Sequence, residues 1–447
     1  MECPSTLRRC VVSAPHLHVR VEIELDRPPF SLHRASDTRS VVAAPDLLRA
    51  IASQRLPCAV LDLRAFDRNL DRQRALSRAH GLPLRLATKS VRAPALLRRC
   101  LARGGSDLRG LLCFSVAEAE ALAGQGHDDL FVAYPPSLRR GDGHDLARAS
   151  ALAARGVSLV LAVDSREAIE AAAAEARRLE TTLSLALCID MSLELAGGRV
   201  HLGVRRSPLR RANEIVALAR LVTDTRGTRF AGLLCYEAQV AGLPDRNPFA
   251  RVENPVKELI RRRSISDVAG RRRAIVEALT RAGLEPRIVN GGGTGSLDST
   301  TRESGVTEVS AGSGLFKPLL FDYFHDAHVR ALEPSLYFAL EVTRVPGPGW
   351  ATVSGGGYVA SGSAGPDKLP RPVLPEGLTL DDMEGAGEVQ TPLRLSRGTT
   401  LRLGDAVLFR HAKAGELCER FAEILVVEGD RVVDRVPTYR GLGWTFF

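Results

Sequence analysis

One lysine and two glycine-rich turns are the residues of this sequence best suited to chemistry. Lys89 follows the apolar run 84–88, within the stretch Arg-Leu-Ala-Thr-Lys-Ser-Val-Arg, and the turns occupy 289–296 and 310–316. Glycines let backbone N–H groups approach an anion closely, and three hydroxyl groups add further donors: Thr294, Ser296 and Ser313. A lysine beside such an anion site suits a phosphorylated aldehyde held as a Schiff base, which indicates pyridoxal 5'-phosphate.

These residues can act together only if the fold brings them to one place. Eight β-prone runs predict strands, at 84–88, 110–114, 130–133, 158–163, 183–189, 230–236, 287–290 and 307–310. Helical patterns separate most of them, at 65–80, 93–102, 116–125, 143–154, 166–179, 208–223 and 248–282, whereas 291–306 shows no clear helical pattern. This order predicts an α/β fold, a (β/α)8 TIM-type barrel, because an open doubly wound sheet usually has fewer strands.

In such a barrel the lysine follows strand one, and the glycine turns follow strands seven and eight. All three then lie at the C-terminal face, where barrel enzymes keep their active sites and frequently bind phosphate. Taken alone, a lysine after a strand is more often solvated, and a glycine-rich stretch is more often a simple turn. Their order along the chain is what favours a cofactor site.

A second, C-terminal β-rich domain is expected after the barrel. Short strand-like runs occur at 335–345, 350–354, 401–403, 406–409, 422–427 and 431–436, and 361–389 has the Gly- and Pro-rich composition of a surface excursion. We therefore divide the chain into four parts: an irregular N-terminal segment at 1–25, a strand contribution to the β domain from 26–58, the barrel at 59–324 and the β domain at 325–447.

Charge and cysteine usage exclude several classes of protein. The net charge of +9 includes a basic run at 261–273, but no aromatic residues interleave with it, so a solvated helix face is favoured over nucleic-acid binding. The eight cysteines form no C-x-x-C pair, which is typical of a reducing compartment. Without an apolar run of membrane-spanning length or a signal peptide, the sequence predicts a cytoplasmic protein with no membrane partner.

Seven ordered segments carry a resemblance to a known family: 85–92, 110–135, 199–210, 230–242, 289–296, 308–324 and 404–427. They resemble the fold-type III pyridoxal-phosphate enzymes, the alanine-racemase-like barrel group, and within it the D-threonine aldolase and D-serine dehydratase-like branch with its bacterial amino acid deaminase/aldolase members. The resemblance covers about 45–445. It implies that Lys89 forms the Schiff base and that two sets of residues hold the phosphate: Gly292, Gly293, Thr294 and Gly295, with Gly312, Ser313 and Gly314.

The resemblance also suggests partners for the cofactor ring. In related enzymes an arginine in a D-x-G-x-x-R-x-G-like segment approaches the pyridine nitrogen. Here His201 stands in that place, and Arg205 is the competing choice. Tyr236, at the end of the sixth expected strand, would stack near the ring or bond its substituents. The alternatives are an ordinary histidine at a strand–helix junction and an aromatic residue of the barrel rim.

A divalent metal ion, Zn or Mn, is a further expectation from the resemblance. His411 fits the histidine ligand of the related enzymes, and Cys418 is the proposed partner. The related enzymes separate the two ligands by one residue, whereas six residues separate His411 from Cys418. The alternative is that His411 serves alone as an acid–base group and Cys418 packs in the core.

The expected activity is that of a pyridoxal-phosphate-dependent lyase. It would cleave a β-hydroxy-α-amino acid, of D configuration, by retro-aldol reaction, or dehydrate it, with Lys89 and His411 as catalytic residues. The resemblance further implies a homodimer that takes a small-molecule amino acid substrate. The alternatives are an amino acid racemase or epimerase and a non-catalytic pyridoxal-phosphate-binding protein.

Overall fold

The computed structural model describes residues 44–139 and 144–446. These residues form one compact unit. The expected irregular segment at 1–25 and most of the segment 26–58 lie outside them. Within the described part of the chain, no helix combines the length and the apolar character that crossing a membrane requires.

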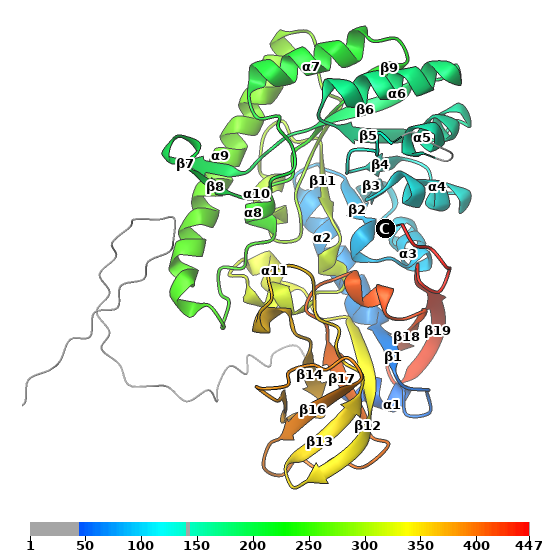
Figure 1. The fold of residues 1–447 in the computed structure, drawn as a ribbon, viewed down its shortest axis with the longest axis vertical. Helices are drawn as coiled ribbons and strands as arrows, with labels where there is room; N and C mark the ends of the chain where they lie inside the picture. Colours follow the sequence, from blue (N-terminus) through cyan, green and yellow to red (C-terminus); the bar gives the residue numbers. More distant parts are fainter. Residues whose placement is uncertain (1–43, 140–143, 447) are drawn as a thin grey trace, which may run out of the picture. The chain divides into compact units, whose positions relative to one another are not determined.

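Eight parallel strands close into a barrel (Figure 1). In barrel order from the first, they are β2 (Leu84–Ala87), β3 (Leu108–Cys113), β4 (Leu130–Val132), β5 (Leu159–Val163), β6 (Leu183–Cys188), β9 (Thr228–Leu234), β10 (Ile288–Gly291) and β11 (Glu308–Ala311). The barrel closes where Val309 of β11 pairs with Leu84 of β2. All eight expected strands and the TIM-type fold are confirmed, with ends that differ by no more than two residues.

The expected helices are also present, and their sequences explain where they start and what they bury. They are α2 (Leu63–Ala79), α3 (Pro94–Gly104), α4 (Val116–Gly124), α5 (Asp145–Ala154), α6 (Arg166–Arg178), α7 (Ala212–Asp224) and α9 (Asn254–Arg281). Ser115 and Ser165 cap α4 and α6 by accepting from backbone N–H groups of the first turn. In α6, alanines and Ile169 recur at helical spacing on the buried face, where they pack on the barrel.

One connection differs from its expectation. The segment 291–306 contains the short helix α10 (Leu297–Thr301), although its Ser- and Thr-rich sequence lacks helical periodicity. Its five residues are too few to show a period, and three of them are buried: Leu297, Thr300 and Thr301.

The second sheet contains nine strands, and an N-terminal strand lies at its centre. β1 (Cys58–Asp62) pairs antiparallel with β12 (Leu336–Gly347) and parallel with β18 (Glu423–Glu428). The remaining strands are β13 (Trp350–Ser354), β14 (Arg371–Leu374), β15 (Leu378–Leu380), β16 (Gln390–Leu395), β17 (Ala406–Arg410) and β19 (Arg431–Pro437). The described part of 26–58 consists of α1 (Ala44–Ala50) and the approach to β1.

Two expectations for this sheet were wrong. The segment 361–389 is not a plain surface excursion, because β14 and β15 within it pair with β17 and β16. These strands are short and β14 contains Pro372, so neither gives a clear alternating pattern. Conversely, 401–403 forms no strand: Leu401 is buried in the irregular segment that precedes β17, which accounts for its apolar character.

Candidate active site

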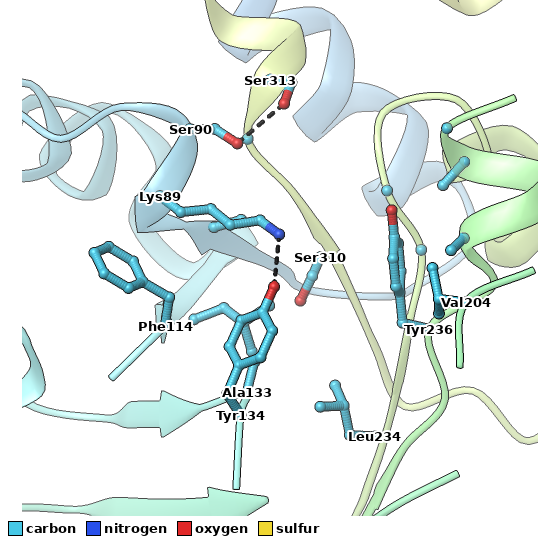
Figure 2. A pocket seen from close by; sticks show the side chains of 18 of the residues that line it. Lys89, Ser90, Phe114, Ala133, Tyr134, Val204, Leu234, Tyr236, Ser310 and Ser313 are labelled. Atoms are coloured by element: carbon cyan, nitrogen blue, oxygen red, sulfur yellow. Dashed lines mark hydrogen bonds between the residues drawn. The ribbon is translucent and has the colours of Figure 1, made fainter. Parts of the chain in front are cut away.

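A cavity of about 690 Å³ opens at the C-terminal ends of the barrel strands. Four of its polar lining residues follow barrel strands: Lys89 after β2, Tyr134 after β4, Asp164 after β5 and Tyr236 after β9. Figure 2 shows Lys89 and Tyr134 on one side of this cavity and Tyr236 on another. The cavity therefore lies on the barrel face where enzymes of this architecture bind their substrates.

Lys89 is held at the cavity by contacts of its backbone and its side chain. It lies in a 3₁₀ turn, Thr88–Ser90, and its Nζ donates a hydrogen bond to Tyr134 Oη at 3.0 Å. Its carbonyl oxygen accepts from Arg92 Nε at 3.1 Å. A Cβ on Gly415 would stand 1.9 Å from the same carbonyl, so the C-terminal domain approaches Lys89 at a position that admits only glycine.

The two glycine turns meet and form one wall of the cavity. Gly292 adopts a φ of +97°, and a Cβ on Gly312 would lie 2.6 Å from the carbonyl oxygen of Ala87. Gly314 N–H donates to Thr294 Oγ1 at 2.8 Å, which ties one turn to the other. Five of the predicted phosphate-binding residues line the cavity: Gly292, Gly293, Thr294, Gly312 and Ser313.

The two other predicted glycines pack behind this wall. A Cβ on Gly295 would lie 2.4 Å from the carbonyl oxygen of Ala241, and one on Gly314 would lie 2.7 Å from Gln73 Oε1. The wall itself consists of backbone and hydroxyl groups, and side chains in place of its glycines would occupy the space that it leaves open. Lys89 lines the same cavity. The residues present therefore fit the phosphate and the aldehyde of pyridoxal phosphate.

A buried ion pair supports the glycine wall, and no sequence motif pointed to it. Glu237 Oε1 accepts from Gly292 N–H at 2.9 Å, Ser296 Oγ at 2.7 Å and Thr300 Oγ1 at 2.6 Å. Its Oε2 accepts from Arg272 Nη2 at 2.8 Å. Glu237 and Arg272 are each 1% exposed. The carboxylate thus holds the first turn in place from behind.

Arg272 also corrects an expectation about the basic run at 261–273. This run was predicted to be a solvated face of a helix, but Arg272 of α9 is buried and contacts Glu237, Glu303 and the carbonyl oxygen of Cys235. Burial lowers the pKa of the guanidinium, but the charges of Glu237 and Glu303 raise it by a larger amount, so the net shift of the pKa is upward. One buried arginine among many exposed ones cannot be recognised from charge alone, because its partners lie in other elements.

Tyr236 lines the cavity as predicted, whereas the two residues predicted for the pyridine nitrogen do not. His201 lies in β8 (Val200–Leu202), which pairs with β7 (Leu193–Leu195), and its Nδ1 is 3.7 Å from Glu194 Oε1. Among the described residues, the cavity lining includes Arg206 but neither His201 nor Arg205. The Arg206 guanidinium carbon lies 5.6 Å from the centre of the Tyr134 ring and 5.9 Å from that of Tyr236.

Burial and neighbouring cations shift the titration of three cavity residues. Burial raises the pKa of Tyr134, but Lys89 and Arg206 outweigh it, so the net shift is downward. Burial raises the pKa of Tyr236 against the opposing effect of the same two cations. Burial also raises the pKa of the Asp164 carboxyl. The cavity therefore contains a phenol and a carboxyl that are both displaced toward neutral pH.

The predicted metal ligands lie in the protein interior. His411 is 2% exposed and Cys418 is 1% exposed, and the His411 ring packs edge-on against Phe316. Burial lowers the pKa of His411 to about 3 and raises that of Cys418 to about 12. The described cavity lining takes Lys413, Ala414 and Glu416 from this segment instead. The pair thus offers no ligand to the cavity, and its metal-binding role remains a prediction.

A second group of possible ligands lies nearer the cavity. Asp190, Glu194 and His201 each offer an atom within 4.8 Å of the others. Arg210 approaches both carboxylates, with Nη1 3.0 Å from Asp190 Oδ2 and Nε 3.1 Å from Glu194 Oε2. Because the Arg210 guanidinium bridges the two carboxylates, we interpret the group as an ion-pair network.

Comparisons with known proteins agree with this geometry. Over 284 residues the chain is 26% identical to 3-hydroxy-D-aspartate aldolase of Paracoccus denitrificans (strain Pd 1222), which covers 62% of this chain and 64% of that protein. It is 28% identical over 368 residues to D-threo-3-hydroxyaspartate dehydratase of Delftia sp. (strain HT23), covering 78% and 89%. The chain thus spans slightly less than two thirds of the length of the Paracoccus enzyme.

Solved structures show the same fold. D-threonine aldolase from Filomicrobium marinum superposes with a TM-score of 0.73 at 22% identity, over 88% of this chain and 97% of that one. The Delftia dehydratase gives a TM-score of 0.65 at 23% identity, over 87% and 98%. The model of the alanine racemase N-terminal domain matches residues 61–319, more than half of the chain. This chain therefore belongs to the alanine racemase N-terminal domain family, within the fold-type III pyridoxal-phosphate group.

Proposed function

We propose that this protein is a pyridoxal-phosphate-dependent lyase that cleaves or dehydrates a β-hydroxy-α-amino acid of D configuration. The observation that carries the proposal is the single cavity that Lys89 shares with the two glycine turns. The names of the relatives support the substrate class, since they include 3-hydroxy-D-aspartate aldolase, D-threonine aldolase of Arthrobacter sp. and D-threo-3-hydroxyaspartate dehydratase. Each named substrate carries a hydroxyl group on the carbon next to the amino-bearing carbon.

The chain's own residues would divide the work of binding. When bound, pyridoxal phosphate supplies a sink for the electron pair left by a bond broken at Cα. Lys89 would hold it covalently, and the cradle of backbone N–H and hydroxyl groups in the two turns would hold its phosphate. Tyr236 and Arg206 line the same cavity and would flank the ring, so we favour Arg206 over His201 and Arg205 as the cation nearest the cofactor.

A base must take the proton of the substrate β-hydroxyl in aldol cleavage. The resemblance assigns this role to His411, alone or through a metal ion held with Cys418, but both side chains are buried behind the cavity. Asp164 lines the cavity, and burial raises the pKa of its carboxyl toward the range useful for proton transfer. We therefore propose the Asp164 carboxylate as the acceptor of the hydroxyl proton.

The assembly and compartment follow from the resemblance and the sequence. We propose a cytoplasmic homodimer, since related enzymes pack the β domain of one subunit near the barrel of another. Size-exclusion chromatography with light scattering on the full-length chain tests this assembly.

The decisive experiment combines a spectrum with product analysis. We expect the purified protein to show a visible absorption band of the bound cofactor that is lost in Lys89→Ala, together with at least about a 100-fold fall in turnover. D-threonine should yield acetaldehyde and glycine by cleavage, or 2-oxobutanoate and ammonia by dehydration. D-threo-3-hydroxyaspartate should yield glyoxylate and glycine, or oxaloacetate and ammonia. The L enantiomers are the controls, and a protein without the band or any of these products would contradict the proposal.

A further inference from the structure

Lys89 is hydrogen-bonded to a tyrosine that no sequence motif pointed to. Its Nζ lies 3.0 Å from Tyr134 Oη and 5.5 Å from the centre of the same ring. Figure 2 shows the two side chains pointing toward each other from the segments that follow β2 and β4. Lys89 is exposed and Tyr134 is half-buried. The pair thus lies where the protein wall meets the open part of the cavity.

A second cation faces the same phenol. Arg206, from the segment after β8, lies over the Tyr134 ring and also over Tyr236, which follows β9. Burial raises the pKa of Tyr134, but the two cations outweigh this effect and lower the pKa below its ordinary value. Among the described residues, the charged or titratable groups that face Tyr134 are Lys89, Arg206 and Tyr236. The two cations favour its phenolate form.

This arrangement matters because an ammonium nitrogen has no free electron pair. A lysine side chain ordinarily titrates near about 10.4, so at neutral pH it must lose a proton before it can bond to an aldehyde carbon. An acceptor for this proton must lie within hydrogen-bonding distance of Nζ, and Tyr134 Oη does.

We propose that Tyr134 accepts the proton that Lys89 loses when it bonds to the cofactor aldehyde. The Nζ–H bond breaks, the phenolic O–H bond forms, and Nζ keeps the electron pair with which it bonds to the aldehyde carbon. The two remaining amine protons leave with the carbonyl oxygen as water. Proton transfer within the pair leaves its net charge unchanged.

The inference rests on the proposed cofactor but is tested without any substrate. The measurement is the rate at which full-length protein, freed of cofactor, takes up pyridoxal phosphate, followed by the visible band and by borohydride trapping at Lys89. In Tyr134→Phe we expect uptake at pH 7 to slow about 100-fold. The deficit should close at high pH, where hydroxide in the solvent can remove the lysine proton without the phenol. Tyr236→Phe, which removes another phenol of the same cavity, should keep the wild-type pH dependence.

A second variant tests the role of the neighbouring cation while Tyr134 stays in place. Arg206→Gln removes the charge that favours the phenolate, so the pH of half-maximal uptake rate should rise, and Arg206→Lys should restore most of it. An ultraviolet titration adds a direct readout. The difference between the wild type and Tyr134→Phe should show a phenolate that forms below about pH 10.

The outcomes separate this inference from the proposed function. Equal uptake rates in the wild type and Tyr134→Phe, or a deficit of the same size at every pH, would overturn the inference and leave the lyase proposal standing. A wild-type protein that takes up no pyridoxal phosphate would overturn both.

Discussion

Two buried glutamates support two parts of the cavity wall, and they are stabilised in different ways. Glu237, behind the glycine turns, is paired with the Arg272 guanidinium at 2.8 Å. Glu118 of α4 lies behind Phe114 and accepts from its N–H at 2.7 Å and from the Tyr439 hydroxyl, also at 2.7 Å. One carboxyl faces a cation and the other faces a neutral donor.

The difference shows how the partner decides the state of a buried acid. Burial raises the pKa of Glu118 to about 7, and the hydrogen bonds from Phe114 and Tyr439 offset only part of that effect. The glycine wall is therefore held by an ion pair, whereas the wall beside Phe114 is held by a carboxyl that changes charge near neutral pH. The same substitution at the two positions should have different consequences.

The largest effect is expected for Glu237→Gln. It leaves Arg272 buried with only Glu303 as a charged partner, so we expect the free energy of unfolding to fall by about 3 kcal/mol. Urea denaturation of the wild type and the variant measures this change. The Kd for pyridoxal phosphate should rise as well, because the Gly292 N–H loses its carboxylate acceptor. A stability change within about 0.5 kcal/mol would show that the ion pair does not support the turn.

A similar effect is expected from pH acting on Glu118. In the unfolded chain this carboxyl loses its proton near 4.5, whereas in the folded protein it keeps the proton up to about 7. Rising pH therefore favours the unfolded state across this window, and roughly 3 kcal/mol of stability is lost by its upper end. The measurement is the difference in unfolding free energy between the wild type and Glu118→Gln at several pH values. A difference that stays constant from pH 4.5 to 7 would contradict the assignment.

A smaller effect is expected for Glu118→Gln at pH 5. The folded wild type then carries a protonated carboxyl at this position. In the variant the amide oxygen can accept from the Phe114 N–H, and the amide NH2 can donate to Tyr439 Oη as the protonated carboxyl would. We expect unfolding free energies that agree within about 1 kcal/mol, measured by urea denaturation. A loss as large as that of Glu237→Gln would mean that Glu118 is charged in the folded protein, which would remove the contrast between the two sites.

The smallest effect is expected from removal of metal ions. His411 and Cys418 belong to neither support and are buried behind the cavity. We therefore expect dialysis against EDTA to leave both the cofactor band and the rate of turnover unchanged. If turnover falls and added Zn or Mn restores it, a metal ion takes part in the reaction. Loss of this rescue in His411→Ala, but not in Glu194→Gln, would then place the ion at His411 and Cys418.

The barrel and most of its phosphate wall could be predicted from sequence because their signals are local. The strands are continuous apolar runs. Gly292 adopts a positive φ, and a run of glycines in the sequence indicates such a backbone conformation. Glu237 and Arg272 could not be found in this way, since they meet only when α9 packs on the barrel, 35 residues apart in the chain. Tyr134 and Arg206 were missed for the same reason: each acquires its role from a neighbour on another element.

The residues predicted for the pyridine nitrogen, His201 and Arg205, lie outside the described cavity lining for a different physical reason. The short sheet of β7 and β8 takes up His201 in a pairing with Glu194. Of the arginines that follow this hairpin, the described cavity lining contains Arg206 and not Arg205. Spacing within a motif cannot reveal this choice, because the hairpin depends on backbone pairing between two segments of little local preference.

The position of β1 has a consequence for synthesis of the chain. This fully buried strand leaves the ribosome before any barrel strand, but its neighbours β12 and β18 begin only at Leu336 and Glu423. Throughout translation of the barrel, both edges of an apolar strand are therefore without their native partners, a condition that favours aggregation. The nascent chain needs protection over this interval, and its C-terminal sheet cannot be completed until nearly the whole protein has been made.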